Sequence, residues 1–314
     1  MQAIQSTIDA LRLGPAQIFE NLAVFAILGK QGPAPDYQIL DDALTGETAR
    51  ITEVSESGSV PELRFENDGA RPVLLLDGEE LIGAKQNRIL NLSILAPGAS
   101  TMKIPVSCVE AGRWAWRDRR FGASGRTQYA SARAMKMTQV SDSLHAAGTA
   151  RSDQRAVWDD ISRKMARMEA YSASGAMSDL YARHDDRVTR YVGAIAPAAD
   201  QVGAVFALNG EIRGVELFDC AQTFARQFPK LLRGWALDGI DEAGDGVRIP
   251  VAAEAEAMLR EVGALPAQAY PAAGLGEDVR LAGERAAGGA LVVDGRVVHL
   301  CAFRLTRRDL RTPR

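Results

Sequence analysis

A short polar run early in the chain has the residue types of a ligand site. Residues 77–88 read DGEELIGAKQNR, which places carboxylates, a lysine, an amide pair and an arginine together after an apolar stretch. Glu79 is a candidate acid–base or metal-holding group, and Arg88 has the side chain to hold phosphate. Gln86 and Asn87 offer hydrogen bonds to a base or ribose. A solvated loop between two strands explains the same charges, so both interpretations stay open.

A second polar run, SCVEAGRW over 107–114, closes an expected strand and supplies complementary groups. Glu110 is the second candidate acid–base or metal-holding group, Arg113 a second phosphate ligand, and Trp114 a surface for stacking. Two carboxylates near phosphates can hold Mg²⁺, which makes metal-assisted hydrolysis the natural reaction class if chemistry occurs. The sequence defines no metal ligand set beyond this. Cys108 has no nearby histidine to lower its pKa, which favours a buried thiol over a nucleophile.

The stretch from Arg113 to Lys136 is strongly basic and contains interleaved aromatic residues. It holds seven basic residues against the single acid Asp118, with four aromatic residues between them. Arginine binds phosphate in bidentate fashion and aromatic rings stack on bases, so a mobile basic–aromatic loop beside the two polar runs fits a phosphorylated ligand. A solvated loop without a ligand is the alternative interpretation. The sequence contains no Walker or GxGxxG motif, so a standard nucleotide fold is not indicated.

These runs must be positioned by elements that the residue pattern predicts to be mixed. Alternation and turn signals predict short strands over 20–110, helical periodicity predicts a hairpin of helices over about 127–195, and 202–304 reads as hairpins and helices. Pro229 falls inside a helix expected from about Cys220, so a kink or break is expected there. We predict the α+β class: an antiparallel strand-rich sheet or small barrel, a central helical hairpin, and mixed C-terminal hairpins and helices. The expected domain is 15–304, preceded by a helix or tail over 1–14.

Composition limits the classes of function. The chain has 314 residues, 46% of them apolar, and a net charge of −3, which excludes a disordered chain and makes nucleic acid an unlikely partner. The three cysteines are far apart and form no disulfide or zinc pattern. We find neither a signal peptide nor the roughly 18 apolar residues that a membrane span needs. A cytoplasmic protein without membrane contact is therefore expected.

The two polar runs also carry a family resemblance. LLLDGEELIGAKQNRILN, followed by IPVSCVEAGRW, resembles the ARG and rhodanese-phosphatase-superfamily-associated domain family, which is poorly characterised and mainly prokaryotic. The later stretches GVELFDC, KLLRGWALD and GGALVVDGRVVHLCAF resemble it too, so the likeness covers most of 15–304. The resemblance implies a context of ADP-ribosylglycohydrolases and NAD-derived metabolites, and it transfers no catalytic residue.

Together these observations predict a protein that binds or processes a small anionic, nucleotide-type ligand such as ADP-ribose. The alternative is a non-catalytic module that docks an acidic protein or RNA through the basic–aromatic loop. Whether the chain is an enzyme, whether Mg²⁺ takes part, and the oligomeric state are left open by the sequence.

Overall fold

The computed structural model describes residues 2–30, 34–244, 248 and 250–305. The chain divides into two compact units, and each is described by itself. The sheet unit comprises Met1–Pro35, Arg187–Pro271 and Gly276–Arg314, and the barrel unit comprises Asp36–Asp186 with Ala272–Leu275. That residues 15–304 form a single domain stays a prediction.

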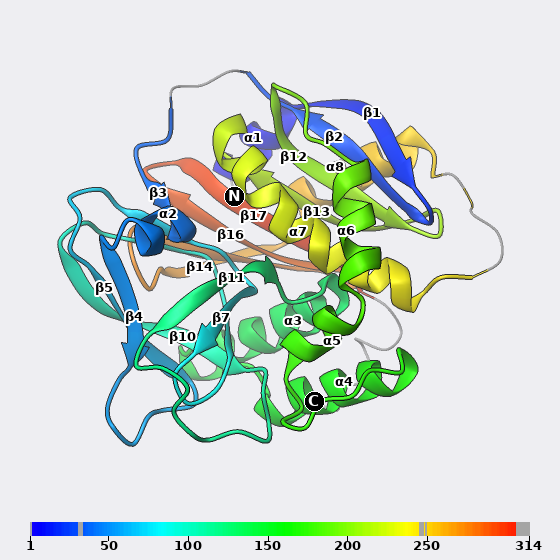
Figure 1. Cartoon of the computed structure of the whole chain (residues 1–314). Coiled ribbons are helices and arrows are strands. Elements are labelled where there is room, and N and C mark those ends of the chain that lie inside the picture. Colours follow the sequence, from blue (N-terminus) through cyan, green and yellow to red (C-terminus); the bar gives the residue numbers. More distant parts are fainter. Residues whose placement is uncertain (1, 31–33, 245–247, 249, 306–314) are drawn as a thin grey trace. The chain divides into compact units, whose positions relative to one another are not determined.

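The sheet unit is built on one antiparallel sheet of eight strands (Figure 1). Its strand order is β1-β2-β12-β13-β17-β16-β15-β14. The strands are β1 Arg12–Phe19, β2 Leu22–Leu28, β12 Gln201–Leu208, β13 Glu211–Phe218, β14 Ala267–Pro271, β15 Glu277–Ala282, β16 Ala286–Val293 and β17 Arg296–Arg304. The β12–β13 and β16–β17 hairpins were predicted from the sequence, whereas β1, β14 and β15 were not.

Turn chemistry fixes those two hairpins. Asn209 and Gly210 have φ of 51° and 78°, and Asp294 and Gly295 have φ of 50° and 77°. Positive φ at both central residues is the turn geometry that matches the right-handed twist of paired strands, and Asn-Gly and Asp-Gly adopt it at low cost. The two turns therefore form where the sequence predicts them.

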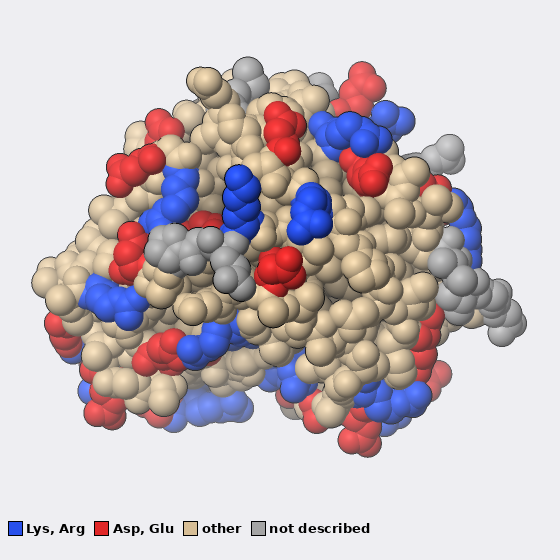
Figure 2. Space-filling view, turned by 90° about the horizontal axis from the view of Figure 1, so that it is seen from above, with Lys and Arg blue, Asp and Glu red and all other residues tan. Residues whose placement is uncertain are grey.

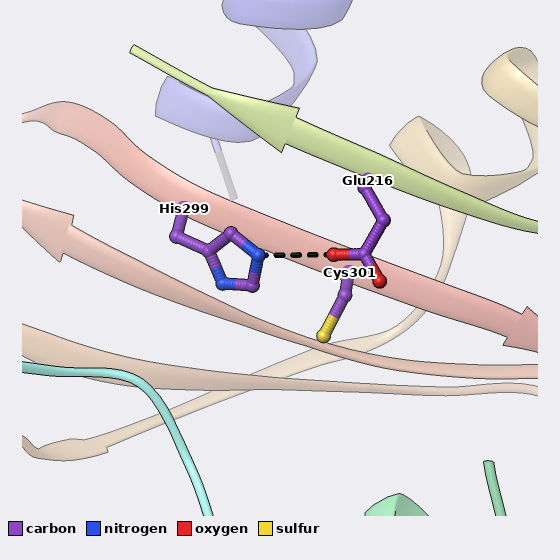
Figure 3. Close-up of side chains that lie close together, drawn as sticks. All are labelled: Glu216, His299 and Cys301. Carbon is purple, nitrogen blue, oxygen red and sulfur yellow. Dashed lines mark hydrogen bonds and ion pairs between the residues drawn. The ribbon is translucent and has the colours of Figure 1, made fainter. Parts of the chain in front are cut away.

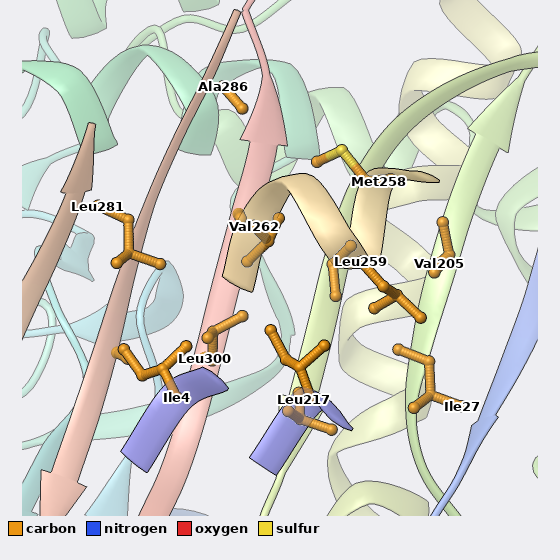
Figure 4. Close-up of a cluster of buried hydrophobic side chains, with 14 of the residues drawn as sticks. Ile4, Ile27, Val205, Leu217, Met258, Leu259, Val262, Leu281, Ala286 and Leu300 are labelled. Carbon is orange, nitrogen blue, oxygen red and sulfur yellow. The ribbon is translucent and has the colours of Figure 1, made fainter. Parts of the chain in front are cut away.

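Helices cover both faces of this sheet. α1 Gln2–Asp9 and α8 Ala252–Ala264 pack on one face, where Leu217, Met258 and Leu300 belong to one buried cluster (Figure 4). α7 Ala221–Asp241 lies on the other face, where Trp235 stacks on Phe206 with ring centroids 4.7 Å apart. Side chains alternate between the faces of a strand, so Glu216, next to Leu217, points to the α7 side.

α7 runs without a break through Pro229, where a kink or a break was expected, so the alternative of a break is wrong. Pro229 is exposed, while Phe228 and Leu231 beside it are buried. Packing of the apolar face thus holds the helix together across the position where proline removes one backbone donor.

The barrel unit contains a closed barrel in the order β10-β5-β4-β11-β7-β8, and a three-stranded sheet in the order β3-β6-β9. The barrel strands are β4 Ala49–Glu53, β5 Glu62–Asn67, β7 Glu79–Gly83, β8 Arg88–Leu90, β10 Ser100–Cys108 and β11 Phe121–Thr127. The small sheet consists of β3 Gln38–Ile39, β6 Val73–Leu75 and β9 Ile94–Ala96, and α2 is Leu40–Thr45. The prediction of a small barrel is therefore confirmed.

Four helices follow the barrel where a hairpin of two was predicted. They are α3 Ala130–Ala147, α4 Gln154–Arg167, α5 Met177–Arg183 and α6 Asp185–Ala194. The stripe expected to run through residues 177–192 is interrupted at His184, which ends α5. Only α4 matches a single predicted helix, because the other boundaries depend on tertiary packing rather than on periodicity.

The basic stretch is also more ordered than predicted. Phe121–Thr127 forms barrel strand β11, and Ala130 begins α3, so only 113–120 and the two residues 128–129 remain as connecting segments. The α+β class, with mostly antiparallel sheets, is confirmed. Among the residues that the structure describes, no helix is long and apolar enough to cross a membrane.

Candidate ligand-binding site

One end of the barrel interior is lined by polar side chains instead of apolar ones. Ile51 and Leu90 belong to the apolar barrel core, and strand periodicity places Glu53 and Arg88 on the same inward face two residues away. The register pairs Arg88 with Leu81 on β7 and with Cys108 on β10. The barrel thus brings a buried acid, a buried arginine and a thiol together at this end.

Arg88 and Glu53 are both buried and incompletely satisfied. The Arg88 Nη1 donates to the Gln86 carbonyl oxygen (3.0 Å) and to Gln86 Oε1 (3.2 Å). In the part of the chain that the structure describes, the Arg88 Nε and Nη2 atoms have no acceptor and both Glu53 carboxylate oxygens have no donor. Arg88 Nη2 lies 3.8 Å from Glu53 Oε1. Burial lowers the pKa of Arg88, although the charge of Glu53 acts against this shift.

Such an arrangement is costly in the absence of a ligand. A buried polar group without a hydrogen bond costs about 1–3 kcal/mol, and more if it is charged. A ligand that offers an anionic acceptor to Arg88 and a hydroxyl or amine donor to Glu53 would remove this cost. The pair therefore has the chemistry of a binding site for a ligand with both groups.

Tryptophans and a lysine lie directly beside this pair. The Lys85 Nζ lies over the rings of Trp114 (5.4 Å to the centroid) and Trp116 (5.0 Å), and the Arg88 guanidinium carbon is 5.7 Å from the Trp114 centroid. The exposed fraction of Trp114 is 47%. A Cβ atom on Gly58, whose φ is +77°, would lie 3.1 Å from Trp114, 3.3 Å from Glu53 Oε2 and 3.3 Å from Lys85 Cδ. Lys85, Trp114 and Glu53 therefore meet at one place.

Glu110 and Arg113 form a clamp, meaning an ion pair closed by two hydrogen bonds. Arg113 binds Glu110 with two hydrogen bonds, Nε to Oε1 (2.9 Å) and Nη2 to Oε2 (2.7 Å). Glu110 also accepts from the Asn87 backbone N–H (3.0 Å) and the Ser174 hydroxyl (2.9 Å). Burial favours the neutral acid, but hydrogen bonds from Arg113, Asn87 and Ser174 outweigh it and lower the pKa of Glu110. Both carboxylate oxygens are thus engaged within the protein.

Gln86 and Asn87 link the clamp to Arg88. Gln86 donates to the Glu110 carbonyl oxygen (2.8 Å), and its Oε1 accepts from the Cys108 thiol (3.0 Å) as well as from Arg88. Asn87 Oδ1 accepts from Arg113 Nη2 (3.2 Å). Burial raises the pKa of the Cys108 thiol despite the opposing charge of Arg88, so the cysteine stays a neutral donor. These side chains hold Arg88 in place.

The other acids of the first polar run have separate partners. Glu79 is buried and its Oε2 accepts from the Leu76 backbone N–H (3.2 Å). Arg126 Nε binds Glu80 Oε2 at 2.7 Å, and burial raises the pKa of Glu80 despite this pairing. Asp77 accepts from Arg133 Nε (3.1 Å) and Lys136 Nζ (2.8 Å).

The sequence therefore identified much of one connected network and missed part of it. Hydrogen bonds connect Gln86, Asn87, Arg88, Glu110 and Arg113, and Trp114 lies against Arg88. Glu79, at the start of β7, instead accepts from the Leu76 backbone N–H, which precedes this strand. Glu53, Lys85 and Trp116 were not singled out. The alternation of ARITE, with Ala49, Ile51 and Glu53 at inward positions, was the available signal for Glu53.

The basic stretch contributes less free charge than its composition suggests. Arg113, Arg126, Arg133 and Lys136 are bound to acids at the contacts above, and Arg119 Nη1 binds Glu56 Oε1 at 2.8 Å. The face drawn in Figure 2 shows basic and acidic side chains interspersed. The ion pairs of the basic stretch give little support to a continuous basic track within it.

Comparison with known proteins gives one match. A family model described as the ARG and Rhodanese-Phosphatase-superfamily-associated Protein domain matches residues 10–303. No curated protein and no solved structure matches the chain.

Proposed function

The chain belongs to the family whose model spans residues 10–303, and on that premise we propose that it binds a small anionic ligand of nucleotide type. ADP-ribose and other NAD-derived metabolites are the first candidates, because the family's name records an association with ARG and the family resemblance implies a context of ADP-ribosylglycohydrolases. Such ligands also combine phosphate, hydroxyl groups and an aromatic base, which match the groups of the site. The observation that carries the proposal is the buried Arg88–Glu53 pair with unsatisfied atoms beside the half-exposed ring of Trp114.

Each group has a role that follows from its contacts. Arg88 Nε and Nη2 bind phosphate oxygens, with Lys85 as a second cation nearby. Glu53 accepts hydrogen bonds from ribose hydroxyls, and Trp114 stacks on the base. Gln86, Asn87, Glu110 and Arg113 orient Arg88 through the hydrogen bonds described above.

Binding is favoured over metal-assisted hydrolysis at Glu79 and Glu110. Mg²⁺ is bound through carboxylate oxygens and keeps several waters. Both oxygens of Glu110 already accept hydrogen bonds from Arg113, Asn87 and Ser174, so this carboxylate fits a structural clamp better than a metal ligand. A hydrolytic reaction at these residues stays a prediction.

Calorimetric titration of the full chain with ADP-ribose, AMP, ribose 5-phosphate and inorganic phosphate tests the proposal. Arg88→Met should weaken binding of ADP-ribose by about ten- to a hundred-fold, since hydrogen bonds to a charged group contribute about 1.5–3 kcal/mol. Arg120→Met is the matched control, because it removes the same charge from an exposed position in the segment that follows Trp114 and should leave the affinity unchanged.

Trp114→Leu keeps the test informative if Arg88→Met does not fold, because Trp114 is half-exposed. This variant should lose affinity for ADP-ribose and AMP but not for inorganic phosphate. Absence of binding to the whole panel, or wild-type affinity in both variants, contradicts the proposal. Tight, strongly salt-dependent binding of RNA or an acidic protein together with indifference to nucleotides would favour the docking module instead.

A further inference from the structure

Three potential metal ligands meet within the sheet unit, outside the site described above. Glu216 lies on β13, and His299 and Cys301 lie on the neighbouring strand β17. The register pairs Glu216 directly with Cys301, and His299 is two residues away on the same face of β17. Figure 3 shows the three side chains together on one side of the two strands.

The donor atoms are close enough for one ion. One ligand atom from each residue lies within 4.8 Å of the other two, and His299 Nε2 is 3.1 Å from Glu216 Oε2. Ligands around tetrahedral zinc stand about 3.3–3.8 Å apart, given bond lengths of about 2.0–2.3 Å. Small side-chain rotations are therefore sufficient to close the site. All three side chains are buried, as zinc sites of protein interiors are.

Two neighbouring residues favour metal binding by these three side chains. The Phe218 ring lies 4.7 Å from the His299 ring and limits its orientation. On the other side of β17, Gly289 of β16 pairs with Cys301, so β16 places no side chain next to the thiol at that register position. The imidazole is thus fixed while the space beside the sulfur has no bulky group from β16.

We propose that Glu216, His299 and Cys301 bind a divalent late transition metal, with Zn²⁺ the foremost candidate. A thiolate and an imidazole select such ions over Mg²⁺ and Ca²⁺, which prefer oxygen ligands alone. Three protein ligands leave a fourth coordination position, which water fills in zinc sites of this kind.

The charge balance of binding is favourable. Zn²⁺ binds an imidazole through a ring nitrogen, a carboxylate through oxygen and a cysteine as the thiolate, whose proton passes to solvent. Two anionic ligands then surround a dication. The metal-bound cluster therefore carries no net charge, so no uncompensated charge is buried.

Metal binding by the full chain, stripped with a chelator and freed of any histidine tag, tests the proposal. We expect one Zn²⁺ per chain by calorimetry and elemental analysis. Co²⁺ should give the near-ultraviolet charge-transfer absorption of a cobalt–thiolate bond. Cys301→Ser should abolish this absorption and weaken Zn²⁺ binding by at least about 100-fold, because losing a ligand costs more than losing its supporting hydrogen bond.

Cys220→Ser is the matched control. Cys220 is a buried cysteine of the same unit whose Sγ caps α7, and serine is a preferred residue at that position. This variant should keep the cobalt–thiolate absorption and the zinc affinity. Failure of wild-type protein to bind Zn²⁺ or Co²⁺ stoichiometrically, or a Co²⁺ complex without thiolate absorption, overturns the proposal and leaves His299 and Glu216 as a structural hydrogen-bonded pair. The wild-type spectrum decides this even if Cys301→Ser does not fold, and it is independent of nucleotide binding.

Discussion

Asp77 is a buried carboxylate that faces two buried cations. Burial opposes its ionisation, but the charges and hydrogen bonds of Lys136 and Arg133 outweigh this effect and lower the pKa of Asp77. A pKa lowered in the folded state means that the charged form stabilises the fold at neutral pH, and that this contribution is lost as pH falls through the folded pKa.

We expect Asp77→Asn to destabilise the protein by about 3–5 kcal/mol at pH 7, because Lys136 and Arg133 would stay buried without this carboxylate. Urea denaturation followed by circular dichroism measures the change in unfolding free energy. Asp68→Asn is the control, since Asp68 pairs with Arg50 on the exposed surface and should contribute about 1 kcal/mol or less. Equal effects of the two substitutions would contradict the interpretation.

The lowered pKa of Glu110 predicts that the stability of the folded protein depends on pH. Its pKa is lowered below the ordinary value of 4.5 by hydrogen bonds from Arg113, Asn87 and Ser174, which overcome the effect of burial. The folded state therefore binds fewer protons than the unfolded state in this window, and stability falls as pH drops below about 4.5. Glu110→Gln should cost about 1–3 kcal/mol at pH 7, and the difference from wild type should shrink toward pH 3.

Denaturation series from pH 7 to pH 3 measure this convergence. Glu62→Gln is the control, because Glu62 pairs with Lys103 in an exposed ion pair and should give a small, nearly constant difference. A Glu110→Gln difference that does not change with pH would show that the Glu110 charge does not stabilise the folded state.

At the scale of elements, the close approach of β7 and β11 requires a glycine at the end of β7. Gly83 has φ of +138°, and a Cβ atom there would lie 2.4 Å from the Arg120 backbone oxygen. The same ladder contains Gly122, where a Cβ atom would meet nothing within 4 Å. Comparing substitutions at Gly83 and Gly122 therefore distinguishes the effect of backbone strain and steric overlap from the general effect of replacing a glycine in a strand.

We expect Gly83→Ala to destabilise the protein by at least about 1–3 kcal/mol, since both the positive φ and the steric overlap oppose it. Gly122→Ala should be neutral or slightly stabilising, by up to about 1 kcal/mol, because alanine restricts the unfolded chain. Thermal melts of both variants test this, and a loss of stability in Gly122→Ala equal to that in Gly83→Ala would refute it.

At the scale of the molecule, the groups proposed to bind the ligand all lie in one continuous segment. The barrel closes with strands from within Ala49–Thr127, and Glu53, Lys85, Arg88 and Trp114 lie in this range. We expect a fragment of residues 36–186 to fold with cooperative unfolding and dispersed amide resonances. If it also binds the ligand of the full chain, the site is complete within the barrel unit. An unfolded fragment would show that barrel closure depends on other segments.

The sequence by itself determined the local features of this protein. Asn-Gly and Asp-Gly set two hairpin turns, alternation in ARITE set a strand, and the apolar stripe of α7 set a helix, although not its continuation through Pro229. These features depend on residues close in sequence, whose backbone preferences and periodicity are readable directly. The polar composition of 77–88 and 107–114 likewise indicated the hydrogen-bonded network around Arg88. Charged residues between apolar strands cost free energy to bury unless they are paired and hydrogen-bonded, so a cluster of them indicates a site.

Only the tertiary structure decided which polar groups meet. The inward register of the closed barrel placed Glu53 next to Arg88, and pairing with distant acids neutralised Arg126, Arg133 and Lys136, which composition alone presented as a basic loop. Glu216 and His299 are 83 residues apart, and their contact depends on the register between β13 and β17. Strand register and closure are cooperative, long-range outcomes of packing, because a shift of one residue turns every side chain to the other face.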